Sequence, residues 1–150
     1  MPQSFGALYF HLIFSTKNRL PHITPEIQPR LYEYIGGILS HRKSVQLAAG
    51  GISDHIHLLV SLCRDTSISD TLRDIKSLSS SWIHDTFPRS HDFAWQSGYA
   101  AFSVSHSNLD AVRTYLANQS EHHRGKTFQE EYLEFLKRHD IEYDERYIWD

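Results

Sequence analysis

The chain has 150 residues, of which 40% are hydrophobic and 22% are charged. This length fits one domain, and the composition excludes a disordered chain. The net charge of −3 taken alone argues against nucleic-acid binding, because such domains are usually basic. The single cysteine, Cys63, excludes an internal disulfide and a cysteine-based zinc finger. With no apolar run of membrane-spanning length and no signal segment at the start, we expect a cytoplasmic protein.

The charge is unevenly distributed along the chain. Residues 128–150 hold three basic and eight acidic residues, a net charge of −5, so residues 1–127 carry +2. The mildly basic residues 1–127 are therefore compatible with a nucleic-acid-binding surface, although the net charge of the whole chain is negative. Histidine is also frequent, with 11 copies, and it serves metal binding, proton transfer and packing alike.

Hydrophobic periodicity and turn residues predict the elements in chain order. They are a strand at 7–16, a helix that Thr24 and Pro25 open, hairpin strands at 45–51 and 55–62, a helix at 69–87, a strand at 99–104, a helix at 107–125 opened by a Ser107/Asp110 capping box, and an acidic helix at 128–136. The order β-α-β-β-α-β predicts a ferredoxin-like (RRM-like) α+β fold with an antiparallel sheet and helices on one face. The other face would be free for a site or a partner. We expect one domain, with a core at about 7–106, a helix at about 108–124, and an acidic helix and tail at about 127–150.

His55 and His57 are the first candidate ligands. Residues i and i+2 of a strand point to the same side, so both imidazoles leave one face while Ile56 and Leu58 supply the other. Two imidazoles at this spacing can share one divalent cation. The alternative is that both are surface histidines on a half-exposed sheet.

Tyr115, Gln119 and His122 share one face of the predicted helix at 107–125. Tyr115 and Gln119 are about 40° apart around the axis, and His122 is about 20° to the other side of Tyr115. The alternative is a tyrosine at the edge of the core that is held by a hydrogen bond. A phenol is a poor nucleophile near neutral pH, but a nearby metal that polarises a phosphate makes it useful. A metal on His55 and His57, completed by Gln119 beside Tyr115, would give a phosphotyrosine ester with a nucleic acid.

Several motifs together resemble the IS200/IS605-type single-tyrosine transposases of the HUH endonuclease group. The resemblance runs from about residue 7 to residue 150. The motifs that carry it are Phe14–Arg19, Gly50–Asp54, His55–Val60, Trp95–Tyr99, Tyr115–Gln119 and Asn118–His123.

The resemblance implies an enzyme, a transposase that cleaves and rejoins single-stranded DNA at the ends of an insertion element. Tyr115 would be the nucleophile and would keep the 5′-phosphate as a covalent link. His55, His57 and Gln119 would hold Mg²⁺ or Mn²⁺. The family also implies recognition of DNA hairpins near the element ends, and a homodimer in which the histidines of one subunit work with the tyrosine of the other.

For His122 and His123 two roles stay open: contact with the metal or the scissile phosphate, and orientation of neighbouring groups. Basic residues near the motifs are candidates for phosphate contacts, with solvated surface charge as the alternative. They are Lys17, Arg19, Lys76, Arg113 and Arg124, together with Arg42, Lys43 and Lys126. Trp82, Trp95 and Tyr99 could stack on bases or pack in the core.

Two other functions fit the same residues. One is a non-catalytic module of this fold that binds single-stranded nucleic acid or represses its own element, which the low overall basicity favours. The other is a metal-dependent phosphoesterase in which water attacks and no covalent adduct forms.

Overall fold

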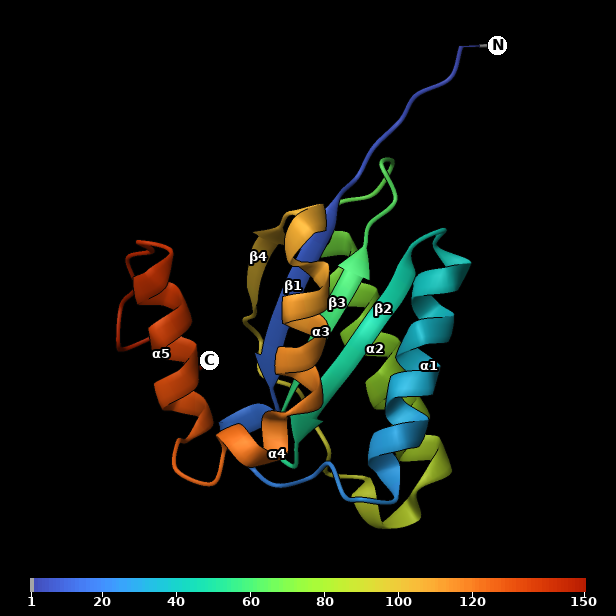
Figure 1. Ribbon diagram of the computed structural model, residues 1–150. Helices are drawn as coiled ribbons and strands as arrows, with labels where there is room; N and C mark the ends of the chain where they lie inside the picture. Colours follow the sequence, from blue (N-terminus) through green and yellow to red (C-terminus); the bar gives the residue numbers. More distant parts are fainter. Residues whose placement is uncertain (1) are drawn as a thin grey trace.

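Residues 2–150 are described by a computed structural model, in which four strands form one antiparallel sheet (Figure 1). The strands are β1 (Tyr9–Ser15), β2 (Val45–Ile52), β3 (His55–Ser61) and β4 (Ala100–Val104), in the order β2-β3-β1-β4. The central strands β1 and β3 are buried along most of their length, as their apolar sequences predict. Strand order and antiparallel pairing confirm the ferredoxin-like α+β fold.

Helices α1 (Ile27–His41) and α2 (Ile68–Thr86) cover one face of the sheet. Apolar residues recur every three or four positions along each helix, so one stripe of each helix faces the strands. Ser67 begins α2 as an N-cap, because its hydroxyl accepts a hydrogen bond from the Asp70 backbone N–H at 3.0 Å. The main core joins these stripes to alternate strand residues, among them Leu12, Phe14, Ile56, Leu58, Leu31, Ile35, Leu72 and Ile75.

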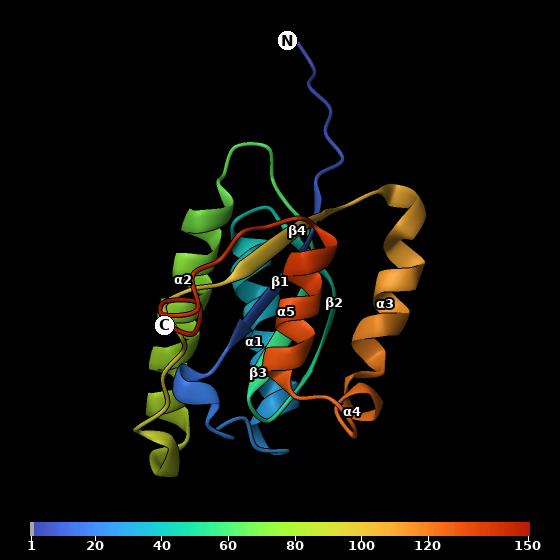
Figure 2. The ribbon, with the colours of Figure 1, turned by 90° about the vertical axis from the view of Figure 1, so that its left-hand side faces the viewer.

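The opposite face of the sheet is covered too, so the expectation of a free face is wrong. Helices α3 (Leu109–Ala117), α4 (Gln119–His122) and α5 (Phe128–Arg138) follow β4. In Figure 2, α5 lies in front of the sheet with α1 behind it, and α3 stands beside α5. The physical reason is that this face also carries apolar side chains that need cover. Two smaller cores form here, one around Ile13, Phe102 and Phe128 and one around Leu59, Leu109 and Leu116.

The continuous helix expected at 107–125 is broken in the structure. A short 3-10 turn at His106–Asn108 precedes α3, and Asn118 separates α3 from α4 with non-helical angles (φ −104°, ψ 23°). The expected capping box does not form, since the Ser107 hydroxyl bonds to Ser105. Asparagine favours helix ends over helix interiors, which explains the break directly after the turn that carries Tyr115.

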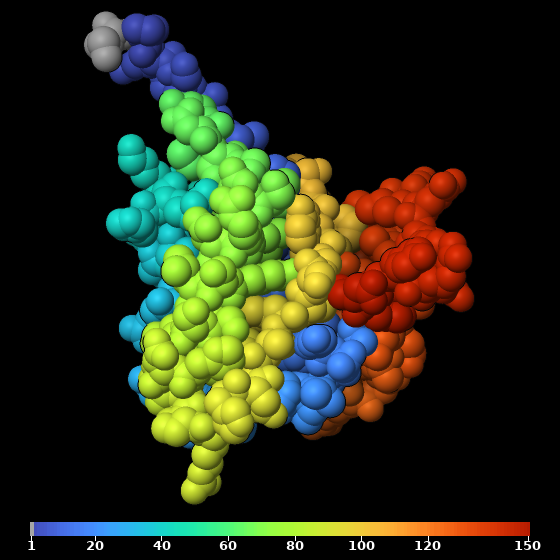
Figure 3. Space-filling view, turned by 180° about the vertical axis from the view of Figure 1, so that it is seen from behind, coloured from blue at the N-terminus to red at the C-terminus, as the bar shows by residue number. Residues whose placement is uncertain are grey.

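The last residues fold back onto the body of the protein. Trp149 packs against α5, and its carbonyl accepts a hydrogen bond from Arg19 at 2.6 Å. The Asp150 carbonyl accepts from the Gly98 N–H at 2.9 Å. Seen from behind, the end of the chain lies against the segment that follows β1 (Figure 3). Among the described residues, no helix has both the length and the apolar character needed to cross a bilayer.

Candidate metal and tyrosine site

The β2–β3 hairpin places His55 and His57 beneath the second helical layer. β3 pairs with strands on both sides, with His57 opposite Gly50 and His55 opposite Ile52 on β2. Both imidazoles point to the face covered by α3, α4 and α5, as the alternation predicts, and both are fully buried. They are therefore not surface histidines.

Both histidines have a hydrogen-bond partner at Nδ1. The His55 Nδ1–H donates to the Asp54 carboxylate at 2.7 Å, and the His57 Nδ1 lies 2.7 Å from the Nε2 of buried His11. Burial lowers the pKa of His57 to about 4, and burial together with the nearby His57 lowers the pKa of His11 to about 3. Both imidazoles are therefore neutral near pH 7.

Glu131 on α5 stands at the centre of the cluster. Its Oε1 lies 2.9 Å from the Nε2 of His57, 3.5 Å from that of His55 and 3.2 Å from that of His123. Burial alone would raise the pKa of this carboxyl, but hydrogen bonds from His123 and His57 outweigh it and hold the pKa far below its usual range. The carboxylate is thus ionised and 2% exposed.

Glu131 was not predicted from the sequence, although a signal was available. It lies three residues after Phe128 and four before Phe135, on the apolar stripe of α5. A carboxylate on the core-facing side of a helix needs a buried partner. Seven other acidic residues lie between 128 and 150, so Glu131 is easily taken for one more solvent-exposed charge of an acidic segment.

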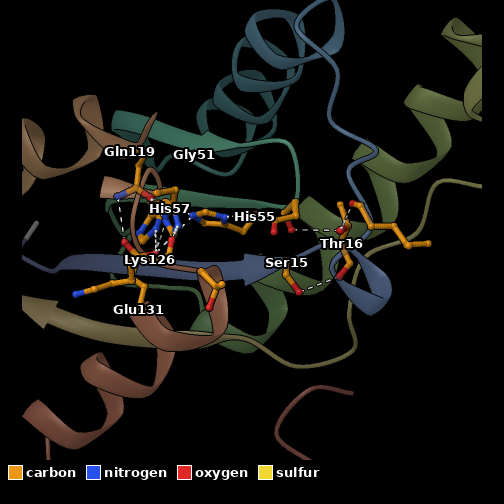
Figure 4. Close-up of polar contacts among 12 residues, drawn as sticks. Ser15, Thr16, Gly51, His55, His57, Gln119, Lys126 and Glu131 are labelled. Carbon is orange, nitrogen blue, oxygen red and sulfur yellow. Dashed lines mark hydrogen bonds and ion pairs between the residues drawn. The ribbon is translucent and has the colours of Figure 1, made fainter. Parts of the chain in front are cut away.

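Gln119 joins the two histidines, as the predicted ligand set requires. Its Oε1 lies 3.0 Å from the Nε2 of His55, and its amide nitrogen donates to Glu131 Oε2 at 3.3 Å. Figure 4 shows His55, His57, Gln119 and Glu131 pointing toward one another from β3, α4 and α5.

Tyr115 reaches the same carboxylate from α3. Its hydroxyl donates a hydrogen bond to Glu131 Oε2, and its ring centre lies 5.8 Å from that of His57. Burial, followed by the hydrogen bond to Glu131 and its charge, raises the pKa of Tyr115, so the phenol is protonated. These groups belong to one chain, whereas the resemblance predicts that the tyrosine meets the histidines of a partner subunit. That shared arrangement stays a prediction about assembly.

His122 and His123 take different positions. The His123 side chain is buried, with Nε2 3.2 Å from Gln119 Oε1 and Nδ1–H donating to the Lys126 carbonyl at 2.6 Å. Burial would lower the pKa of His123, but hydrogen bonds with Glu131 and Lys126 raise it. His122 is exposed and stacks on the Tyr115 ring, 4.6 Å between centres.

Three of the predicted phosphate contacts lie beside the cluster. Arg19 and Arg124, with Lys126, line a hollow of about 550 Å³ that also touches Asp54 and His123. Arg124 is exposed, whereas Arg19 is half-buried with its guanidinium on the Trp149 carbonyl, and the half-buried Lys126 pairs with Glu134.

The other predicted DNA contacts lie elsewhere. Arg113 pairs with Asp110, Arg42 pairs with Asp74, and Lys17 and Lys43 are exposed. The Lys76 ammonium donates to the carbonyls of Gln96, Ser97 and Gly98 at 2.9, 3.1 and 2.7 Å, so it holds that loop.

The tryptophans named as possible base-stacking groups have packing partners. Trp95 is buried and donates to the Ser79 hydroxyl at 3.0 Å, while Trp82 stacks on Tyr34. Tyr99 is partly exposed, and the Lys76 ammonium lies over its ring.

The donor set fits a divalent cation. The ligand atoms of His55, His57 and Glu131 all lie within 4.8 Å of one another. For metal–ligand bonds of about 2.1 Å, neighbouring ligands stand roughly 3.0–3.4 Å apart, close to the observed separations of 2.9 and 3.5 Å between Glu131 Oε1 and the two imidazole nitrogens. Imidazole, carboxylate and amide donors together suit Mn²⁺, with Mg²⁺ as the harder alternative.

Fold and site together define an α+β protein that buries a histidine pair and a carboxylate between its sheet and its last helices, with a half-buried tyrosine beside them. The sequence model of the family described as "Transposase IS200 like" matches residues 4–119. The chain belongs to this family of transposases. Among curated proteins none matches.

Two solved structures share the fold. One is a protein assigned as a transposase from Deinococcus radiodurans R1, 24% identical, with a TM-score of 0.62 over 79% of this chain and 98% of that chain. The other is a REP-associated tyrosine transposase bound to a REP hairpin, 15% identical, with a TM-score of 0.57 over 79% of this chain and 70% of that chain. The family match ends at residue 119, so His123 and Glu131 lie beyond it.

Proposed function

We propose that this transposase cleaves and rejoins single-stranded DNA through a covalent bond to Tyr115, assisted by Mg²⁺ or Mn²⁺. One observation carries the proposal: the Tyr115 hydroxyl and the His55/His57 pair meet at one buried carboxylate. A nucleophile and a cation site so close together suit phosphoryl transfer.

The chemistry follows from the positions of the groups. The Tyr115 oxygen attacks the scissile phosphorus, a new P–O bond forms, and the bond to the 3′ oxygen breaks. The departing 3′ oxygen takes up a proton from solvent, so the products are a 5′-phosphotyrosine and a strand with a free 3′-OH. Glu131 Oε2 accepts the phenol hydrogen bond, so it is the nearest acceptor for the proton. A divalent cation held by His55, His57 and Gln119, with Glu131 beside them, would supply positive charge that polarises the phosphate and stabilises the leaving oxygen.

The reverse reaction rejoins strands. A 3′-OH attacks the phosphotyrosine, and the Tyr115 oxygen leaves and regains its proton. The hairpin in the REP-associated relative supports a hairpin substrate, and the hollow beside Asp54 and His123 offers Arg19, Arg124 and Lys126 for its backbone. We assign Lys17 and Arg113 to contacts further along the same DNA. Lys76 is left out, because its ammonium already donates to three backbone carbonyls.

The test is adduct formation on labelled single-stranded oligonucleotides that tile the DNA flanking the gene, with Mn²⁺. The native chain should give a protein–DNA adduct that survives denaturation, Tyr115→Phe should give none, and Tyr147→Phe, at an exposed tyrosine, should match the native chain. An adduct in Tyr115→Phe means another nucleophile. Cleavage without an adduct indicates a phosphoesterase, and salt-sensitive binding without cleavage indicates a binding module.

Assembly is tested by mixing variants. Tyr115→Phe and His57→Ala chains are combined and assayed for the adduct. Regained activity means a homodimer in which the subunits exchange tyrosine helices. No recovery means that each chain uses its own Tyr115, the arrangement seen in the single chain.

A further inference from the structure

The Nδ1 atoms of the two candidate ligands have unlike partners. His55 donates to Asp54, a carboxylate at the edge of the cluster, whereas His57 faces the imidazole of His11 on β1. His11 is 3% exposed, and its ring lies edge-on to those of Phe102 and Phe135. Neither the motif spacing nor the family resemblance gave His11 a role.

The protonation of a neutral imidazole decides which nitrogen can bind a cation. A neutral ring carries one N–H, so a lone pair on Nε2 requires the proton on Nδ1. For His55, the Asp54 carboxylate accepts only and fixes this tautomer. For His57, the atom opposite Nδ1 is the Nε2 of His11, 2.7 Å away, so His11 must be the acceptor when the Nε2 of His57 binds a cation.

We propose that His11 is a positioning residue for His57. The Nε2 of His11 accepts the hydrogen bond from the Nδ1–H of His57, which holds the His57 ring in place and leaves the Nε2 lone pair of His57 for the cation when one is bound. The inference rests on the proposed metal-assisted function.

Burial explains why an imidazole suits position 11. The Glu131 carboxylate is already buried within the cluster, and a second buried carboxylate beside His57 would add an uncompensated charge. A histidine provides the acceptor without the charge. Asp54 can be a carboxylate because its side chain is 22% exposed.

The experiment measures cation binding without DNA. Chelator-treated protein is titrated with Mn²⁺ in a calorimeter, for the native chain and for His11→Phe, His11→Gln and His139→Phe. His11→Phe keeps an aromatic ring and removes the acceptor. His11→Gln places an amide oxygen near the position of the lost Nε2. His139→Phe is the matched control, because His139 also lies against the Phe102 ring, by stacking, but is exposed.

We expect His11→Phe to weaken Mn²⁺ binding by roughly 10- to 100-fold, His11→Gln to restore most of it, and His139→Phe to match the native chain. Nitrogen NMR of the native chain with Zn²⁺, a diamagnetic probe, should show His57 protonated at Nδ1. This second readout does not depend on how the variants fold.

Two results would overturn the inference alone: native affinity in a folded His11→Phe, or a His57 that carries its proton on Nε2 in the Zn²⁺ complex. If the native chain binds no divalent cation, the metal assistance in the proposed function fails as well. Adduct formation by Tyr115 is measured separately, so the failures are distinguishable.

Discussion

Gly50 sets how closely the tyrosine helix approaches the sheet. It lies on β2 opposite His57, and the backbone of Leu116, the residue after Tyr115, rests directly on it. A Cβ at this position would meet the Leu116 carbonyl oxygen first, and it would lie 2.7 Å from the carbonyl carbon and 3.2 Å from the Cα. All three neighbours are backbone atoms, so no side chain can turn away. We therefore choose Gly50→Ala as the perturbation of the Tyr115 position.

The displacement follows from these distances. Ordinary contact with a Cβ begins at 3.4 Å, so the Leu116 carbonyl carbon alone requires the helix backbone to retreat by about 0.7 Å, and the nearer carbonyl oxygen requires more. An error near 1 Å in the placement of a reacting group costs roughly 10²-fold in rate. Overpacking of this kind also lowers the free energy of unfolding by about 1–3 kcal/mol. We expect Gly50→Ala to fold, with slower adduct formation.

The assay compares the rate of Tyr115–DNA adduct formation under single-turnover conditions with unfolding in urea. Gly37→Ala is the matched control, because Gly37 is exposed on α1 and a Cβ there meets nothing within 4 Å. It should keep the native rate and gain about 0.5–1 kcal/mol of stability. Native rate and stability in Gly50→Ala would show that this contact does not position the tyrosine.

Two further predictions concern α5. Trp149→Ala should lower the free energy of unfolding by about 2–3 kcal/mol and speed hydrogen exchange in α5, because the indole packs 5.6 Å from the Tyr132 ring and 6.3 Å from the Phe128 ring. A loss of stability no larger than that of Tyr147→Ala, at an exposed tyrosine, would contradict this packing role. Glu131→Gln should lower the pKa of Tyr115, because the raised pKa depends partly on this carboxylate. The tyrosinate absorbance of Tyr115, identified by comparison with Tyr115→Phe, should then appear at lower pH than in the native chain. An unchanged titration would mean that burial alone raises the pKa of Tyr115.

The sheet and the histidine pair could be predicted because they depend on local pattern. Alternation along β3 determines which side each residue faces, and the structure places His55 and His57 together as expected. Tyr115 and Gln119 also meet the histidines, although the helix between them breaks at Asn118. Four residues of separation keep the two side chains on one side despite the break.

The second layer could not be predicted from local pattern. Which face α5 covers depends on contacts between residues far apart in sequence, such as Phe128 with Ile13 and Phe102. The same holds for the partners of His57, which are 46 and 74 residues away at His11 and Glu131. Hydrophobic periodicity indicates that a side chain is buried, but it does not indicate which residues that side chain contacts.

The cluster draws its members from elements far apart in the sequence, with His11 on β1 and Glu131 on α5. During synthesis the histidine pair and Tyr115 leave the ribosome before Glu131, so the centre is assembled only after α5 has emerged. Until α5 docks, Ile13 and Phe102 lack their apolar cover. We therefore expect fragments that end before α5 to lack a finished centre and to aggregate.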